Sequence, residues 1–211
     1  MSEATDKVSK HSDTKDILKS LLISNKLPSH VKTVEDAFTI AQMGKELGFP
    51  VMQALHYIIP IQGKLSLSAK AVGAILRKNK ITFVTKEDAL YVFADGSTSE
   101  YNNIEGKKPI DRRTTITFTR DGVSEDVSFT WKNAELQGLT SKDNWQRMPS
   151  EMLYSRCLAK GSNRIAQDFL LGLYTAEEIT DSFNISEKNI KRNDDGTVAS
   201  VIEDITHSEV K

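Results

Sequence analysis

The spacing of apolar residues in the first quarter of the chain is helical. A short amphipathic helix is expected over 17–22. Thr33, which an acid follows three residues later, is typical of a helix N-cap, and Gly48 is typical of the end of that helix. Pro50 then favours the start of another short helix, which runs through His56.

After residue 57 the pattern changes from helical to mixed. A proline and a glycine within 58–67 favour a turn or an irregular strand pair. Ser68 is placed to cap the helix AKAVGAILRK. Two strands, ITFVT and ALYVFA, are expected on either side of the polar turn KED at 86–88, and a loop is expected over 95–109.

The clearest alternation of apolar and polar residues occurs in the middle of the chain. It runs over 113–120 and again over 123–131, and Asp121-Gly122 lies between the two segments. This combination predicts a β-hairpin with a type I′ turn. The longest helical pattern follows at 149–171. The order of helices, strands and a long helix predicts an α+β fold, with N-terminal helices and an antiparallel sheet whose hairpin packs against the long C-terminal helix.

Composition places the chain among globular proteins and suggests three segments. It has 211 residues, of which 38% are hydrophobic and 27% charged. A disordered N-terminus is expected over 1–12, one domain over 13–180 and a flexible acidic tail over 181–211. No apolar stretch approaches the roughly 20 residues that cross a bilayer, and no secretory pattern is evident. The cytoplasm is therefore the expected compartment.

Motifs for several kinds of enzyme chemistry are absent from the sequence. There is no P-loop and no dinucleotide fingerprint, and the four histidines have no partners at zinc spacing, so no cofactor, metal or catalytic site is expected. Cys157 has apolar neighbours, which favours a buried, inert thiol over a nucleophile. Asp143, Glu151 and Asp168 suggest a two-metal nuclease site, but their uneven spacing favours solvated surface acids.

Positive charge is concentrated in three segments although the net charge is only −1. No acid occurs within 47–86 or within 152–167, and a third basic segment covers 107–120. Within 152–167, the cations of the long helix therefore have no acid at i,i+4 spacing. A solvated cationic face explains any one such segment, but three together favour contact with phosphates.

These segments supply the predicted DNA-binding residues. Arg156, Lys160 and Arg164 are expected on one face of the long helix, where they would contact phosphates. Trp145 either stacks on a base or packs in the core, and both interpretations stay open. The predicted set is Lys64, Lys70, Lys107, Lys108, Arg112, Arg113, Trp145, Arg147, Arg156, Lys160 and Arg164.

Three segments of the chain resemble the RecT-type single-strand annealing proteins of phages and prophages. They are AQMGKELGFPVMQALHYIIPIQGKLSLSAKAVGAIL at 41–76, FTWKNAELQGL at 129–139 and NWQRMPSEMLYSRCLAKGSNRIAQDFLLGLYTAEE at 144–178. Together with the hairpin they span roughly 33–180.

The resemblance implies a RecT/Red beta-like annealing fold and an activity that needs no ATP. Proteins of this family bind single-stranded DNA, promote pairing with the complementary strand and assemble into rings or helical filaments. They act beside a phage exonuclease and contact the host single-strand-binding protein. The expected function is thus strand annealing in phage recombination, in the bacterial cytoplasm. The alternatives are a metal-dependent nuclease or nuclease accessory, and a protein-interaction adaptor.

Overall fold

A four-stranded antiparallel sheet forms one end of the molecule. The computed structural model describes residues 14–104, 106–182, 190–194 and 197–201. The strands of the sheet are β3 (Thr82–Val92), β4 (Thr98–Ser99), β5 (Asp111–Arg120) and β6 (Val123–Thr130), in the order β4-β3-β5-β6. The predicted hairpin is confirmed as β5 and β6, and both turn residues have positive φ, 52° at Asp121 and 80° at Gly122, as a type I′ turn requires.

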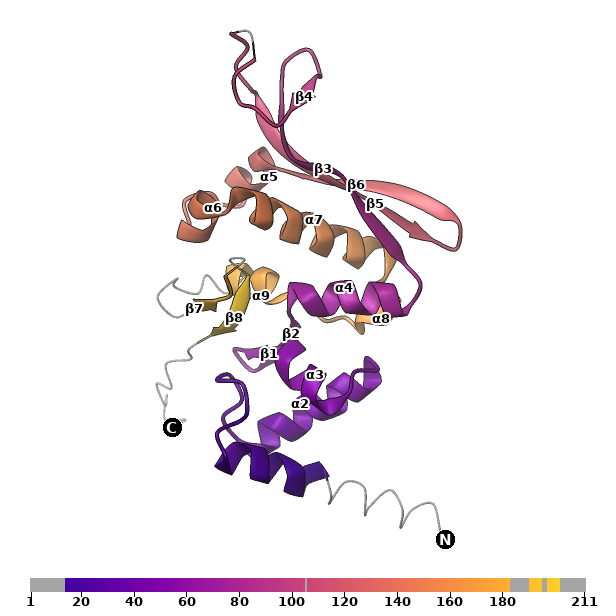
Figure 1. Ribbon diagram of the computed structural model, residues 1–211, viewed down its shortest axis with the longest axis vertical. Helices are drawn as coiled ribbons and strands as arrows, with labels where there is room; N and C mark the ends of the chain where they lie inside the picture. Colours follow the sequence, from indigo (N-terminus) through magenta and orange to yellow (C-terminus); the bar gives the residue numbers. More distant parts are fainter. Residues whose placement is uncertain (1–13, 105, 183–189, 195–196, 202–211) are drawn as a thin grey trace, which may run out of the picture.

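Helix α7 (Pro149–Ile165) packs along this sheet (Figure 1). Gly161 lies directly against the Phe118 ring of β5, and the Cys157 thiol donates to the Val127 carbonyl of β6 at 3.0 Å. The predicted helix over 149–171 is interrupted at its end, where the short helix α8 (Gln167–Leu170) follows α7. Arg120 stabilises the break, because its guanidinium bonds the Ile165 carbonyl at 2.6 Å and also pairs with Asp168.

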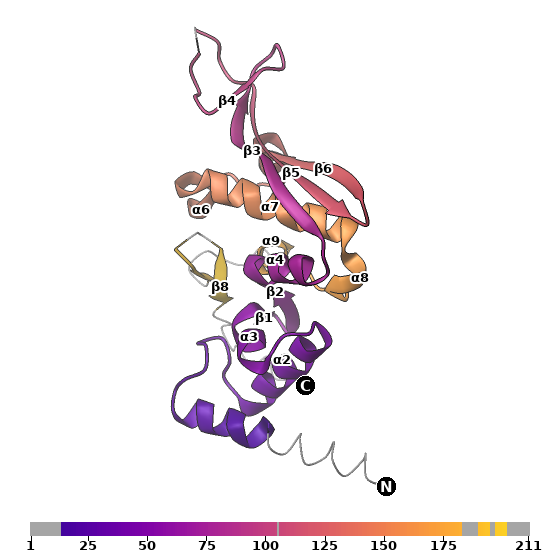
Figure 2. The same ribbon diagram turned by 45° about the vertical axis from the view of Figure 1, so that its right-hand side comes forward.

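The N-terminal half is helical, as predicted, and lies beneath α7 in Figures 1 and 2. A helix over 14–23 precedes α2 (Val34–Glu46), α3 (Val51–Tyr57), the strand pair β1 (Ile58–Ile61) and β2 (Lys64–Leu67), and α4 (Ala69–Lys78). The two predicted caps are confirmed: Thr33 accepts from the Asp36 amide at 3.0 Å, and Ser68 accepts from the Ala71 amide at 3.2 Å. Leu18 of the first helix is fully buried in the main core of the chain itself.

The prediction of two strands joined by a turn at 86–88 is wrong. Residues 82–92 form one strand, β3, with register shifts against β5 on both sides of Glu87. Ala89 has a φ of 51°, its amide donates to Thr114 at 3.0 Å, and its carbonyl accepts from Arg112 at 2.7 Å. The polar residues that favoured a turn therefore form a bulge, which the neighbouring strand holds in place.

A flexible tail was expected from residue 181, but the described residues of this segment form the end of a helix and a pair of strands. Helix α9 (Ala176–Ser182) crosses that boundary, and β7 (Ile190–Arg192) pairs with β8 (Val198–Val201). Their apolar residues form a second core with β1; its members are Ile59, Ile61, Ala176, Ile179, Ile190, Val198 and Val201. The apolar residues of this segment are too sparse to show a period, so only tertiary contact identifies it as folded. The rest of the predicted tail, and residues 1–12, lie outside the described residues.

Two short helices connect the sheet to α7. They are α5 (Trp131–Leu136) and α6 (Asp143–Arg147). Within the part of the chain that the structure describes, every helix is too short or too polar to cross a lipid bilayer. The resulting α+β fold brings α4, α7 and β3 around one groove.

Candidate nucleic-acid interface

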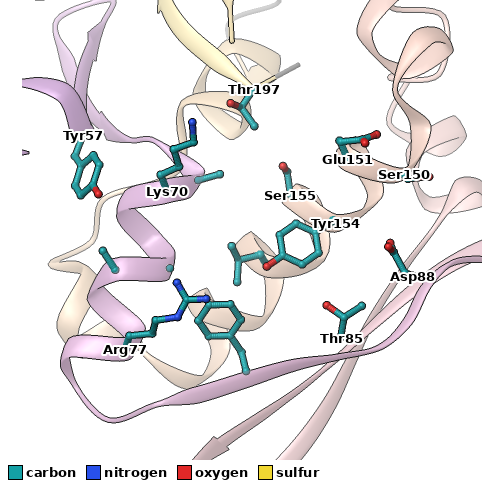
Figure 3. Close-up of a pocket in the computed structure, with 15 residues that line it drawn as sticks. Tyr57, Lys70, Arg77, Thr85, Asp88, Ser150, Glu151, Tyr154, Ser155 and Thr197 are labelled. Atoms are coloured by element: carbon teal, nitrogen blue, oxygen red, sulfur yellow. The ribbon is translucent and has the colours of Figure 1, made fainter. Parts of the chain in front are cut away.

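A groove of about 550 Å³ runs between α4, α7 and β3 (Figure 3). Its walls differ in chemistry. Lys70 and Arg77 come from α4, while Tyr154 and Glu151 come from α7 on the opposite side. Strand β3 contributes Phe83, Thr85 and Asp88 between them. The groove therefore has a cationic wall and an opposite wall that carries an aromatic ring and carboxylates.

The cationic wall follows from the amphipathic sequence of α4. This helix buries Ala71, Val72, Ile75 and Leu76, so Lys70 and Arg77 are left on its exposed side. The guanidinium carbon of Arg77 lies 4.8 Å from the centroid of the Phe83 ring, which fixes the cation over an aromatic face. Arg77 forms no ion pair with a carboxylate of the described residues.

Tyr154 is the aromatic side chain of the opposite wall. Its phenol is half-buried, and burial raises its pKa, with Arg77 acting against this shift and Asp88 adding to it. The phenol is therefore neutral at physiological pH. A neutral ring across from two cations is suited to stacking on a base whose phosphate lies at α4.

The cations predicted on α7 do not serve this groove. The Arg156 side chain is only 11% exposed and forms an ion pair with Asp181, which Lys142 also contacts. Burial lowers the Arg156 pKa, with Glu178 and Glu177 opposing that shift. Arg156 therefore connects α7 to α9, and little of its side chain is exposed for contact with a phosphate.

Lys160 and Arg164, farther along α7, are exposed but have partners on β6. The Lys160 ammonium donates to the Ser128 carbonyl at 2.9 Å, and Arg164 pairs with Glu125 at 2.7 Å. Arg156 and Lys160 line a separate hollow with Phe129 and Asn133, whereas the groove is lined by Tyr154 and Ser155. The predicted helix face exists, but it lies on the other side of α7 from the groove.

Other predicted cations are also paired with acids. Arg113 binds Glu87 through two bonds of 2.7 Å, and this contact holds the pKa of the Glu87 carboxyl below its usual value. Lys107 pairs with Asp95 at 2.6 Å, and Arg147 pairs with Asp143 at 3.2 Å. The sequence did not reveal the first pair, because Glu87 reaches Arg113 from a neighbouring strand.

The remaining predicted residues lie in the groove, at a second cavity or outside both. Lys70 lines the groove, and Lys64 is exposed at the start of β2, outside the residues that line it. Arg112 and Trp145 line a second cavity, of about 320 Å³, next to the loop that carries Lys108. Trp145 is 2% exposed and packs against Trp131 and Phe129, so the core interpretation is the correct one and no free indole face is available for stacking.

Arg77 and Tyr154 are the groove residues that the sequence did not select. Arg77 lies in the acid-free segment 47–86, which was a usable signal, but only the packing of α4 against α7 places it in a groove. Tyr154 is only half-buried on α7, whereas Cys157 and Gly161 of the same helix pack on the sheet.

The three carboxylates considered for a metal site, Asp143, Glu151 and Asp168, do not lie close together. Asp143 pairs with Arg147, and Asp168 pairs with Arg120 at 2.7 Å. Glu151 begins α7 and Asp168 follows its end, which at 1.5 Å per residue separates them by about 25 Å. Among the described residues, no group of three or more metal-binding side chains is present.

No family model matches the chain, and neither the curated proteins nor the solved structures include one that is similar to it.

Proposed function

We propose that this protein binds single-stranded DNA and anneals complementary strands without ATP, as a RecT-type annealing protein in a bacterial cytoplasm. The observation that supports this most directly is the groove, with Lys70 and Arg77 on one wall and Tyr154 opposite. Cations that meet phosphates and an aromatic ring that meets bases are the two features that proteins use to hold single strands without reading their sequence.

The polarity of the groove suggests how a strand lies in it. Phosphates are placed along α4, near Lys70 and Arg77. The bases then point toward α7 and β3, where Tyr154 offers its ring for stacking. Asp88 and Glu151 on the same side repel phosphates, which keeps the backbone of the bound strand at α4.

Annealing in this mechanism is an electrostatic effect without bond chemistry. Two DNA strands repel each other, and the α4 cations offset part of this repulsion. Among the described residues, two cations line the groove, so each protomer contributes a modest salt dependence, with a slope of about −1.4 in log K against log salt for a single strand. Phosphate contact by all ten lysines and arginines of the predicted set would give a far steeper slope.

Assembly of several protomers follows from the small size of the groove. A groove of about 550 Å³ holds few nucleotides, so stable binding of a long strand requires several grooves in a row. We therefore propose a ring or filament on DNA, with a phage exonuclease and the host single-strand-binding protein as partners. Light scattering with and without an oligonucleotide tests this assembly, and a strict monomer under both conditions would contradict it.

The binding proposal is tested with the double variant Lys70→Ala/Arg77→Ala. A matched control, Lys32→Ala/Lys45→Ala, removes two exposed cations that lie outside the groove lining. The groove variant is expected to bind a fluorescein-labelled 30-mer more weakly at 50 mM salt and to lose most of its salt slope. The control variant is expected to match the wild type. An unchanged slope in a folded groove variant would refute the assignment.

The activity itself is measured by mixing complementary labelled oligonucleotides without ATP, with and without magnesium. Faster duplex formation than in protein-free buffer is the expected result, and the groove variant is expected to lose it. Magnesium-dependent shortening of the strands would support a nuclease instead. No effect on either strand, together with no DNA binding, would leave the adaptor alternative.

A further inference from the structure

The second cavity lies beyond the end of the groove, where β3, β5 and the start of α7 meet. Its volume is about 320 Å³, which is at the lower end of the range for small-molecule sites. Tyr91 and Trp131 supply aromatic surface, with the buried Trp145 packed behind Trp131, and Pro109 and Pro149 add apolar lining. The cavity is of a size that suits one planar ring system.

The aromatic wall of this cavity is held in a fixed arrangement. The Arg112 guanidinium lies 5.0 Å from the Tyr91 ring centroid, and it donates to the Ala89 carbonyl at 2.7 Å and to the Ser150 hydroxyl at 2.9 Å. Trp131 packs edge-on against Trp145 with ring centroids 5.9 Å apart. Such pre-ordered rings bind a planar ligand with little further loss of side-chain freedom.

The mouth of the cavity carries charges of both signs. Arg112 and Lys132 line it, and Lys108 precedes Pro109 in the adjoining loop. Lys108 forms no ion pair with a carboxylate of the described residues. Two acids, Asp111 and Glu135, line the cavity as well, and Asp111 accepts from the Arg112 and Lys132 amides at 2.8 and 3.1 Å. The three cations thus outnumber the two acids, which leaves a small excess of positive charge for a phosphate.

The cavity and the groove are neighbours on two elements. Ser150 lines the groove and Pro149 lines the cavity, and Arg112 of the cavity bonds the Ser150 hydroxyl. On β3, Asp88 lines the groove and Tyr91 lines the cavity, three residues apart on either side of the bulge at Ala89.

From this arrangement we infer that the cavity binds one unpaired nucleobase of the strand that occupies the groove. The inference rests on the proposed DNA-binding function and adds a site to it. The base stacks on Tyr91 and Trp131, while its phosphate lies near Arg112, Lys132 and Lys108. A base held in this way anchors the strand at one end of the groove and leaves the bases at Tyr154 available for pairing.

The same apolar lining is also typical of sites for proline-rich peptides, which dock on aromatic and proline surfaces. The observations favour a nucleobase because of the small excess of positive charge at the mouth and the neighbouring groove. A peptide site is therefore treated as an outcome that the experiment distinguishes.

The test uses Ile110→Glu, which places a carboxylate at the rim of the cavity. Ile110 is 49% exposed, so the substitution leaves the core intact. The matched control is Val123→Glu at the exposed tip of the β5–β6 hairpin, outside the lining of both cavities. The probe is a 30-mer in which 2-aminopurine replaces several adenines, and its fluorescence falls when the base stacks on an aromatic ring.

We expect the wild type and Val123→Glu to quench 2-aminopurine on binding, and Ile110→Glu to quench it less, because stacking at Tyr154 remains and stacking in the cavity is lost. Because stacking of one base contributes a measurable share of the affinity, Ile110→Glu is also expected to weaken binding about 5- to 100-fold. A strand of abasic sugar-phosphate is the comparison, and both variants are expected to differ far less in binding it.

The failure of this inference is distinguishable from the failure of the proposed function. If all three proteins bind the 30-mer with equal affinity and equal quenching, the cavity is not a base site although the groove proposal survives. If the wild type binds no DNA, both proposals are overturned. If Ile110→Glu changes only the affinity for a proline-rich decapeptide, the cavity is a peptide site and the inference is refuted.

Discussion

Two helical glycines face phenylalanine rings of the same sheet, at separations that predict opposite effects of one added methyl group. Gly161 of α7 lies on Phe118, and a Cβ there would overlap the Cε2 and Cζ atoms of that ring. Gly73 of α4 lies near Phe83, and a Cβ there would stand 3.5 Å from the Cζ atom, an ordinary van der Waals contact. Both positions are in helix interiors.

The expected magnitudes follow from two opposing terms. Replacing glycine by alanine within a helix stabilises by about 1 kcal/mol. At Gly161 the ring and helix must also separate within a close-packed core, where Phe118 is 0% exposed, and overpacking of this kind costs about 3 kcal/mol. Gly161→Ala is therefore expected to destabilise by about 2 kcal/mol, while Gly73→Ala is expected to stabilise by up to about 1 kcal/mol.

The measurement is urea unfolding followed by far-ultraviolet circular dichroism, with the free energy obtained by linear extrapolation. For a chain of this length, the melting temperature is expected to fall by about 4–8 °C in Gly161→Ala and to rise by about 2–4 °C in Gly73→Ala. Adding Phe118→Leu to Gly161→Ala is expected to recover part of the loss. If Gly161→Ala were at least as stable as the wild type, the close approach of α7 to β5 would be refuted.

Three further outcomes follow from buried polar groups. Burial raises the pKa of the Cys157 thiol to about 11, so iodoacetamide at pH 8 is expected to alkylate the native protein roughly a hundredfold more slowly than the urea-unfolded protein; equal rates would contradict this. Burial lowers the pKa of His30, so on acidification the unfolded chain binds a proton at this residue before the folded chain does. The free energy of unfolding is therefore expected to fall as the pH drops below about 6.5. The variant His30→Phe is expected to show a weaker fall over the same pH range. Arg156→Ala leaves Asp181 with fewer charged partners and is expected to lower the free energy of unfolding in urea by about 3 kcal/mol. The salt slope of DNA binding is expected to stay unchanged. A stable variant with a flatter slope would instead support the predicted contact between Arg156 and a phosphate.

Local features of the fold were predictable because they depend on neighbours in the sequence. The caps at Thr33 and Ser68 need only a side-chain oxygen and an amide three residues later. The Asp121-Gly122 turn needs two residues that tolerate positive φ. The bulge at Ala89 was mistaken for a turn because the groups that hold it, from Arg112 and Thr114, are more than twenty residues away.

The candidate site was predictable only in part, for the same physical reason. The acid-free segment that contains Lys70 and Arg77 was visible in the sequence, and both residues line the groove. Absence of nearby acids was a poor guide elsewhere, because folding brings acids from distant segments. Arg156 meets Asp181 across 25 positions, and Arg113 meets Glu87 across 26.

The sequence by itself determined the N-terminal helices, the main part of the long helix, the hairpin, the caps and the uneven distribution of charge, since each depends on propensities and spacings within one segment. The tertiary structure alone decided which cations line a groove and which are neutralised, and whether Trp145 is buried. Those outcomes depend on which surfaces meet when helices and sheet pack, and a Coulomb interaction responds to distance in space regardless of separation along the chain.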